Sequence, residues 1–205
     1  MQKEKIFEQL TKQIDKCRTC RLCKTRNKAV PGEGNLKAEV VFIGEGPGYN
    51  EDLQGRPFVG RAGDLLEGLL RIIGARRNDI WIGNVVKCRP PENRNPMVDE
   101  IRSCKPYLIE QLRIINPKLI IPLGRFAFEH FFPAGKISRD HGKAFRIGER
   151  IVLPLYHPAA ALRSEAVLQQ LKNDFRKIPR LLHSDSEEII AVTRHPKDEN
   201  QMLLI

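Results

Sequence analysis

The sequence predicts an α/β protein of three layers, with a central, mainly parallel sheet of roughly four strands between helices. Two observations predict this fold. Short apolar runs rich in β-branched residues recur along the chain, as is typical of buried parallel strands. Segments with helical periodicity separate these runs, and this alternation is that of a parallel sheet with helices on both faces.

The strands are expected where the apolar runs lie. These runs are at 40–43, at 80–82 with 85–86 after a Gly-Asn break, and at 119–123. A hairpin is expected over 145–153, with its turn at Gly148 and Glu149, and it leads into a last strand that ends at His157.

The helices are expected between and around these strands. The first, residues 4–16, carries Ile6, Leu10 and Ile14 at a four-residue spacing. The other helical segments are at 62–73, 96–115, 125–132 and 159–182.

The 205 residues are expected to form a single domain, with an N-terminal helix and cysteine loop at 1–30, a core at 31–185 and a tail at 186–205. Lys and Arg number 35 against 25 Asp and Glu, and the formal charge of +10 favours a polyanion such as nucleic acid as the partner. The N-terminus lacks the apolar core of a signal peptide, and no apolar run approaches the roughly 20 residues of a membrane helix. We therefore expect a soluble, intracellular protein. A monomer and a location in the cytoplasm of a prokaryotic cell are separate expectations.

The cysteines indicate a metal centre. In a reducing compartment, five cysteines, three of them crowded at Cys17, Cys20 and Cys23, favour metal or redox chemistry over disulfides. Four thiolates that include Cys88 and Cys104 would suit either tetrahedral zinc or an iron–sulfur cluster. On spacing alone, Cys23 competes with Cys17 for the ligand role, and Cys88 and Cys104 could instead be ordinary buried residues.

The sheet topology predicts where a ligand binds. Loops beyond the carboxyl ends of parallel strands form the ligand crevice of an open α/β sheet. The sequences that follow the predicted strands are Gly44-Glu45-Gly46-Pro47-Gly48, Asn84, Gly124 and His157.

Together with neighbouring motifs, these loops resemble those of the family 4 uracil-DNA glycosylases, the iron–sulfur branch of the uracil-DNA glycosylase superfamily. The resemblance runs in one consistent order from the cysteine cluster to Arg163, and its parts are separately specific. They are Cys17-x-x-Cys20, Gly32-Glu33-Gly34, Gly44-Glu45-Gly46-Pro47-Gly48 with Glu51-Asp52, Gly55-Arg56-Pro57-Phe58-Val59-Gly60, Asn84 with Lys87-Cys88-Arg89-Pro90-Pro91, and His157-Pro158-Ala159 with Leu162-Arg163.

The resemblance implies an enzyme that hydrolyses the N-glycosidic bond of uracil in single- or double-stranded DNA, which releases uracil and leaves an abasic site for base excision repair. It implies that a structural 4Fe–4S cluster is bound by Cys17, Cys20, Cys88 and Cys104, and not by Cys23. A glycosylase without lyase activity is expected, because Schiff-base chemistry needs a desolvated lysine and no motif supplies one.

The resemblance also implies which side chains receive a uracil that has been flipped out of the stack. Phe58 would stack on the base, although a lone Phe is more often a core residue. Asn84 would donate to uracil O4 and accept from N3, a pattern that cytosine reverses. Its alternative is a turn or cap residue.

His157 is the expected electrostatic catalyst, because it would face uracil O2, where negative charge grows. Its alternative is a cap of the helix that follows. Gly46 and Gly48 stand where another branch of the superfamily carries an Asp and a Tyr. The resemblance points to Glu45 for positioning the loop or water and to Glu51 for crowding the thymine methyl position, and the alternative for both is a loop carboxylate bound by backbone amides.

DNA contacts are expected around the same crevice. The cations that would neutralise phosphates are Lys87, Arg89, Arg94 and Arg163. Leu162 is the candidate wedge that fills the vacated stack, although an apolar residue just after a helix start is usually core. The C-terminal residues Gln201 to Ile205 resemble a peptide that binds bacterial sliding clamps, and a tail docked on its own core is the alternative.

Two other functions stay open at this point. One is a relative with wider tolerance for deaminated bases, such as hypoxanthine or xanthine. The other is a non-catalytic, cluster-bearing module that binds abasic or single-stranded DNA and releases no base.

Overall fold

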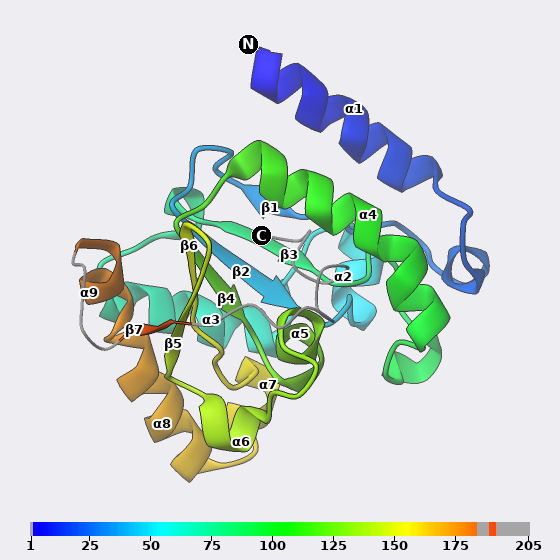
Figure 1. Ribbon diagram of the computed structural model, residues 1–205. Helices are drawn as coiled ribbons and strands as arrows, with labels where there is room; N and C mark the ends of the chain where they lie inside the picture. The colour runs from blue at the N-terminus through cyan, green and yellow to red at the C-terminus, as the bar shows by residue number, and fades with distance from the viewer. Residues whose placement is uncertain (1, 184–188, 192–205) are drawn as a thin grey trace.

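One sheet gathers the buried apolar runs. The computed structural model describes residues 2–183 and 189–191, and within them seven strands lie in the order β1-β3-β2-β4-β6-β5-β7 (Figure 1). The strands are β1 (Glu33–Gly34), β2 (Val40–Gly44), β3 (Trp81–Asn84), β4 (Leu119–Pro122), β5 (Ala144–Ile147), β6 (Arg150–Val152) and β7 (Ile189–Ala191). Strands β3, β2, β4 and β6 are parallel, β1 and β5 are antiparallel to β3 and β6, and β7 runs parallel to β5. The predicted parallel core of about four strands is therefore confirmed.

The predicted hairpin is also confirmed, with β5 and β6 joined at residues 148 and 149. Strands β1 and β7 were not expected, because two and three residues are too few for a period to show in the sequence. The structure ends β3 at Asn84, so Val85 and Val86 leave the strand. Their N–H groups instead donate to the carbonyls of Gly44 and Glu45, which ties the loop after β3 to the loop after β2.

Helices cover both faces of the sheet (Figure 1). Within the described residues they are α1 (Gln2–Lys16), α2 (Tyr49–Gln54), α3 (Arg61–Ile72), α4 (Val98–Ile115), α5 (Arg125–Phe131), α6 (Ile137–Asp140), α7 (Pro158–Ala161), α8 (Glu165–Phe175) and α9 (Ile178–His183). Helices α1, α4 and α5 pack with Val41 and Ile43, whereas α3 and α8 pack with Val40 and Phe42. Since successive strand residues point to opposite faces, β2 serves both layers of the core.

The stripe predicted for the first helix is wrong in one position. The buried residues of α1 are Phe7, Leu10 and Ile14, whereas Ile6 is exposed. Spacings of three and four residues follow the 3.6-residue turn, and a strict four-residue spacing drifts around the helix.

The long helix expected over 159–182 is three helices, α7, α8 and α9. The Ser164 hydroxyl caps α8 by accepting the N–H of Val167, and a cap of this kind starts a new helix. The break leaves Leu162 and Arg163 in a turn between α7 and α8, where their side chains can reach the loops after the strands.

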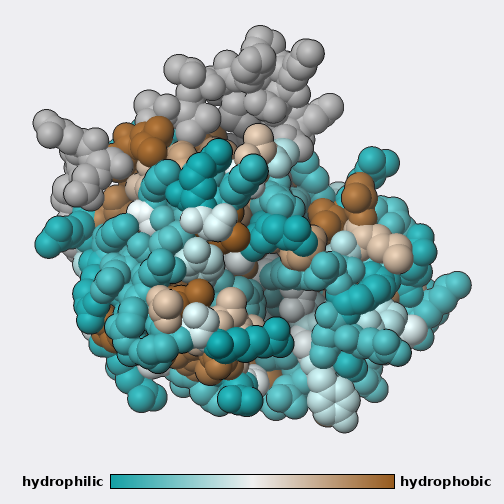
Figure 2. Space-filling model, turned by 90° about the horizontal axis from the view of Figure 1, so that it is seen from below, coloured by the Kyte–Doolittle hydropathy of each residue, from teal (hydrophilic) through white to brown (hydrophobic). Residues whose placement is uncertain are grey.

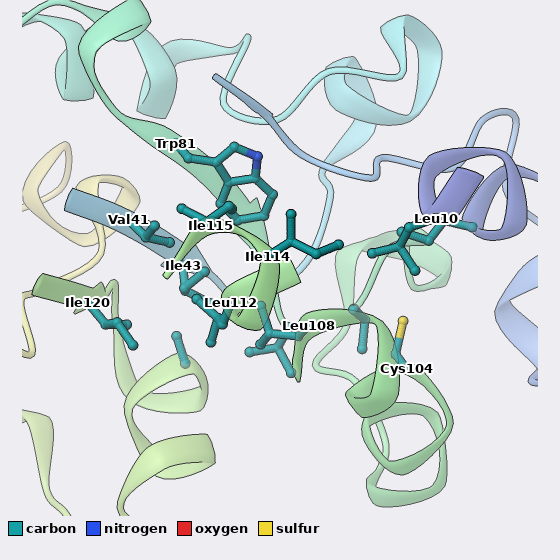
Figure 3. Close-up of a cluster of buried hydrophobic side chains, with 14 of the residues drawn as sticks. Leu10, Val41, Ile43, Trp81, Cys104, Leu108, Leu112, Ile114, Ile115 and Ile120 are labelled. Atoms are coloured by element: carbon teal, nitrogen blue, oxygen red, sulfur yellow. The ribbon is translucent and has the colours of Figure 1, made fainter. Parts of the chain in front are cut away.

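Helix α4 links the core to the cysteines. Cys104, Leu108 and Leu112 are buried at four-residue spacing on one side of this helix. In Figure 3, Leu112 and Leu108 continue a row of side chains that begins at Ile120 and Ile43, and Cys104 lies at the far end of that row. One helix face therefore anchors a thiol on the main hydrophobic core.

None of the helices in the described residues combines the length and the apolar composition needed to cross a membrane. The tail residues 201–205, which carry the expected clamp-binding peptide, lie outside the described residues.

Candidate active site

The loops after β2 and β3, together with α7, surround a cavity of about 490 Å³. This volume lies within the range of small-molecule sites. The surface seen from below, the side toward which β2 points in Figure 1, is hollowed near its centre (Figure 2). The lining residues are Glu45, Gly46, Pro47, Gly48, Glu51, Phe58, Ala62, Asn84, Pro90, Asn93, Arg94, Asn95, His157, Ala159, Ala160 and Arg163. The structure thus brings together every residue expected to contact uracil.

Asn84 ends β3 and pairs in register with Gly44, the last residue of β2. Its side chain is 2% exposed, and within the described residues its amide takes part in no hydrogen bond. A Cβ on Gly44 would lie 2.4 Å from Asn84 Oδ1 and 2.8 Å from the ring of Phe58. The missing side chain at Gly44 is therefore what lets the amide and the ring meet.

Phe58 has φ of 52°, a left-handed backbone conformation that is uncommon for an aromatic residue. Arg77 holds this turn: its Nη1 donates to the Phe58 carbonyl at 3.1 Å, and its Nη2 donates to the Pro57 carbonyl. Glu33 accepts from Arg77 Nε at 2.6 Å. The Gly32-Glu33-Gly34 motif therefore supports the turn that carries the ring into the cavity.

Glu51 is bound by backbone amides. Its carboxylate accepts N–H groups from Gly48 at 3.1 Å, from Val59 at 3.0 Å and from Gly60 at 3.1 Å. These bonds join the start of α2 to the turn that follows Phe58. Glu51 is therefore a loop carboxylate bound by backbone amides, which was the alternative considered from the sequence. It also lines the cavity, and its expected crowding of the thymine methyl position stays a prediction.

His157 is both a helix cap and a cavity residue. Its Nδ1 accepts the N–H of Ala159 at 3.1 Å at the start of α7. Burial lowers the pKa of His157 to about 4, with the charge of Glu51 acting in the opposite direction, so the imidazole is neutral at pH 7. Because Nδ1 accepts, the proton of the neutral ring lies on Nε2. The ring stands 5.6 Å from that of Phe58, centroid to centroid.

Glu45 differs from Glu51, because no hydrogen bond within the described residues holds its carboxylate. Burial raises the pKa of Glu45 to about 6, against the opposing charge of Arg125. A partly buried, unbonded carboxylate on the cavity wall can accept a proton from water near neutral pH.

Two of the expected DNA-contacting residues, Arg94 and Arg163, line the cavity. Arg163 lines the cavity, and the adjacent Leu162 is 41% exposed, which does not fit a core residue. Arg94 lines the cavity too, but two hydrogen bonds of 2.9 and 2.7 Å bind its guanidinium to the Glu100 carboxylate. Arg89 precedes the lining residue Pro90.

The expectation that Lys87 neutralises phosphates is wrong. Lys87 is 1% exposed, and its amine donates to the Asn84 carbonyl at 2.7 Å, 5.9 Å from the centre of the Trp81 ring. Burial lowers the pKa of Lys87 to about 8, although the Cys104 and Cys88 thiols act to raise it. The Lys87 side chain therefore points inward, toward the end of β3, and not toward DNA.

The cysteines gather on the far side of the Asn84 loop. Cys88 and Cys104 are buried, and the partly buried Cys20 packs against their cluster. Cys88 lies within electrostatic reach of Cys17 and Cys20, and Cys104 within reach of Cys20 and Cys88. Cys23 lies near Cys20 and, with Cys17, lines a second cavity. The described residues contain no group of three or more His, Cys, Asp or Glu side chains placed to hold one metal ion.

Arg26 connects these cysteines, and sequence reasoning missed it. Its guanidinium donates to Cys88 Sγ at 2.9 Å, to the Cys17 carbonyl at 3.1 Å and to the Asp15 carbonyl at 2.5 Å. Arg77 was missed as well. Both arginines lie among other Lys and Arg residues, and nothing in the surrounding sequence distinguishes them from these neighbours.

The fold and the cavity define the class of the protein. Residues 31–182 match the family model of the uracil DNA glycosylase superfamily, and the chain belongs to that superfamily. This confirms the resemblance seen in the motifs.

Within the superfamily, the chain is similar to proteins named type-4 uracil-DNA glycosylase. It is 48% identical over 182 residues to that of Saccharolobus solfataricus, which covers 84% of both chains. It is 45% identical over 184 residues to that of Archaeoglobus fulgidus, with 85% of this chain and 92% of the relative covered. It is 44% identical over 179 residues to that of Thermotoga maritima, with 86% and 90% covered.

Proposed function

We propose that the protein is a uracil-DNA glycosylase, which hydrolyses the bond between uracil and deoxyribose in DNA and leaves an abasic site. One observation carries this proposal: within the described residues the amide of Asn84, a residue only 2% exposed, has no hydrogen-bond partner, and it lies in a cavity beside the ring of Phe58 and the neutral His157. Buried polar groups are normally hydrogen-bonded, so an unbonded amide in a cavity supports a ligand that completes it. The similarity to the type-4 enzymes supports the same function.

Asn84 can select uracil by hydrogen bonding. Its side chain can donate to O4 and accept from N3–H, whereas cytosine presents an N4 amine and an unprotonated N3. A buried amide that is left unpaired by the wrong base discriminates strongly, because the desolvation of its polar atoms is not compensated. The ring of Phe58 supplies the aromatic face on which the base lies.

His157 can stabilise the departing base. Negative charge develops on uracil O2 as the glycosidic bond breaks, and a neutral imidazole whose Nδ1 is occupied by the helix cap has Nε2–H free to donate. Glu45 can orient the water that attacks the sugar and take up its proton, because its carboxylate is unbonded and its pKa lies near 6.

We further propose that Cys17, Cys20, Cys88 and Cys104 hold a 4Fe–4S cluster with a structural role. The buried cation of Lys87 supports this, since a buried charge needs a nearby opposite charge. The thiolates of Cys88 and Cys104, when bound to a cluster, would provide it. Arg26 supplies a hydrogen bond to Cys88 Sγ, as is usual around such clusters. The cluster, when bound, would cross-link the loop after α1, the loop after β3 and α4. Iron and sulfide analysis of anaerobically purified protein tests its identity.

The decisive test of the activity is incubation of the purified protein with a uracil-containing oligonucleotide, followed by alkali. A strand break at the uracil position is expected, and it should be absent for Asn84→Ala. Absence of any break with wild-type protein would contradict the proposed function. Release of hypoxanthine or xanthine by Asn84→Ala would favour wider base tolerance, and binding of abasic DNA without base release would favour a non-catalytic module.

No lyase step is proposed. Lys87 is a desolvated lysine, but it does not line the cavity and its amine is bound to the Asn84 carbonyl. Borohydride should therefore trap no covalent adduct between the protein and its DNA product. A monomer and a cytoplasmic location stay predictions from the sequence, and gel filtration tests the first.

A further inference from the structure

Tyr49 is an exposed aromatic residue at the mouth of the cavity. It is the first residue of α2, directly after the lining residue Gly48, and it is 56% exposed. The buried residue of α2 is Asp52, whose carboxylate accepts hydrogen bonds from Asn27, so the Tyr49 ring is not needed to anchor the helix. An aromatic ring left in solvent beside a binding cavity indicates a surface for a partner that stacks.

Arg89 covers one side of that ring. Its guanidinium carbon lies 5.1 Å from the centre of the Tyr49 ring, within cation–π distance. Arg89 comes from the loop after β3 and Tyr49 from the start of α2, so the pair bridges the segments that follow β3 and β2. The stack therefore spans the rim of the cavity where DNA enters.

Arg89 is itself held in place. Its Nε donates to the side-chain oxygen of Asn93 at 2.8 Å, and Asn93 lines the cavity. Glu92 and Asn93 have φ of 54° and 55°, a conformation that residues other than glycine rarely adopt. A turn in an uncommon backbone conformation, next to a guanidinium that lies over the Tyr49 ring, suits a binding role better than a purely structural one.

We propose that Tyr49 and Arg89 form a stacking platform for an unpaired base next to the flipped uracil. This inference rests on the proposed function, because it assumes that uracil enters the cavity. Once uracil leaves the stack, its neighbour loses a stacking partner, and in single-stranded DNA nothing else covers it. An aromatic ring backed by an arginine is the usual protein surface for such a base and binds it without sequence preference.

Stacking can be observed directly with 2-aminopurine, a base whose fluorescence is quenched when it stacks. The probe is a single-stranded oligonucleotide with 2-aminopurine beside a 2′-fluorinated deoxyuridine that resists cleavage. Wild-type protein should quench the 2-aminopurine fluorescence when the label lies on one particular side of the uracil. The Tyr49→Phe variant should quench it equally, and the Tyr49→Leu variant should not. Leu53→Ala is the matched control, because Leu53 is exposed on the same helix but has no aromatic ring to stack on a base.

Turnover gives a second measurement. Tyr49→Ala should raise KM on single-stranded substrate by about tenfold with little change in kcat, since base stacking contributes to binding. The increase should disappear when the neighbouring nucleotide is replaced by a tetrahydrofuran abasic unit. Arg89→Gln should raise KM in the same substrate-dependent manner by a smaller factor.

The two ways of failing are distinguishable. If wild-type protein releases uracil but Tyr49→Leu quenches 2-aminopurine as wild type does, the platform is wrong and the glycosylase activity stands. If wild-type protein releases no uracil from any oligonucleotide, the proposed function fails, and with it the platform. Exposed substitutions should leave the fold intact, which the circular dichroism of each variant checks.

Discussion

The uracil cavity and the cysteine region lie on opposite sides of one short loop, residues 84–88, and they are held together differently. On the cavity side, three features fix the side chains. They are the parallel pairing of β2 with β3, the hydrogen bonds from three backbone amides to the Glu51 carboxylate, and the helix cap at His157. On the cysteine side, the thiols come from two loops and a helix, and Arg26 joins the two loops by donating to Cys88 Sγ and to the Cys17 carbonyl. The cavity is therefore formed by the fold alone, whereas the cysteine region would gain rigidity from the cross-links of the proposed cluster.

The largest effect is expected on the cavity side. Replacement of His157 by Ala should lower kcat by about 10²–10³-fold, because a donor aimed at developing charge is lost. The cluster absorbance and the melting temperature should change little, since His157 caps only the four-residue helix α7. Single-turnover assays on a uracil oligonucleotide measure the rate. A His157→Ala protein with wild-type kcat would show that electrostatic catalysis has another source.

The cysteine side should respond in the opposite manner. Cys88→Ala should lose the cluster, bind DNA more weakly and melt at a lower temperature, because the loop after Asn84 is no longer fixed. Cys23→Ala is the matched control, as this thiol is not among the proposed ligands. Thermal melts and iron content check both variants. A Cys88→Ala protein that stays folded and fully active would contradict a scaffold role for the cluster.

Lys87 joins the two sides, so its replacement should affect both by intermediate amounts. In Lys87→Met no amine bonds the Asn84 carbonyl, and the proposed cluster would lose a buried cation beside it. We expect KM for uracil DNA to rise about fivefold and the cluster to be lost faster on exposure to air. Bleaching of the visible absorbance and steady-state kinetics measure the two effects. If the absorbance of Lys87→Met bleaches at the wild-type rate, the Lys87 charge is compensated without the cluster.

The same contrast explains what the sequence could reveal. Continuous apolar runs predicted β2 and β4, helical periodicity predicted α3 and α4, and the loops at the strand ends predicted the position of the cavity. Lys87 was assigned to the wrong surface, because a lysine in a basic loop has the same sequence pattern whether its stem points outward or inward. Arg26 and Arg77 act across 62 residues to Cys88 and 19 residues to Phe58, and such long-range partners leave no local pattern.

A pH effect separates the two regions. Because burial raises the pKa of Glu45 to about 6, its carboxylate becomes protonated as the pH falls below 6 and can no longer accept a proton from water. The rate should fall about tenfold between pH 7 and pH 5. His157, with a pKa lowered to about 4, stays neutral over this interval and does not contribute to the fall. Rates of single turnover from pH 4.5 to 8.5 give the profile.

Glu45→Gln removes the titrating group, so its slower rate should be independent of pH over the same interval. Lys87→Met is the informative companion, since its pH profile should keep the apparent pKa near 6 even after the cluster begins to bleach. If the apparent pKa moves in that variant, the electrostatic environment of Glu45 depends on the cysteine side. The chemistry of the cavity would then not be independent of the cluster, and the separation between the two regions would be wrong.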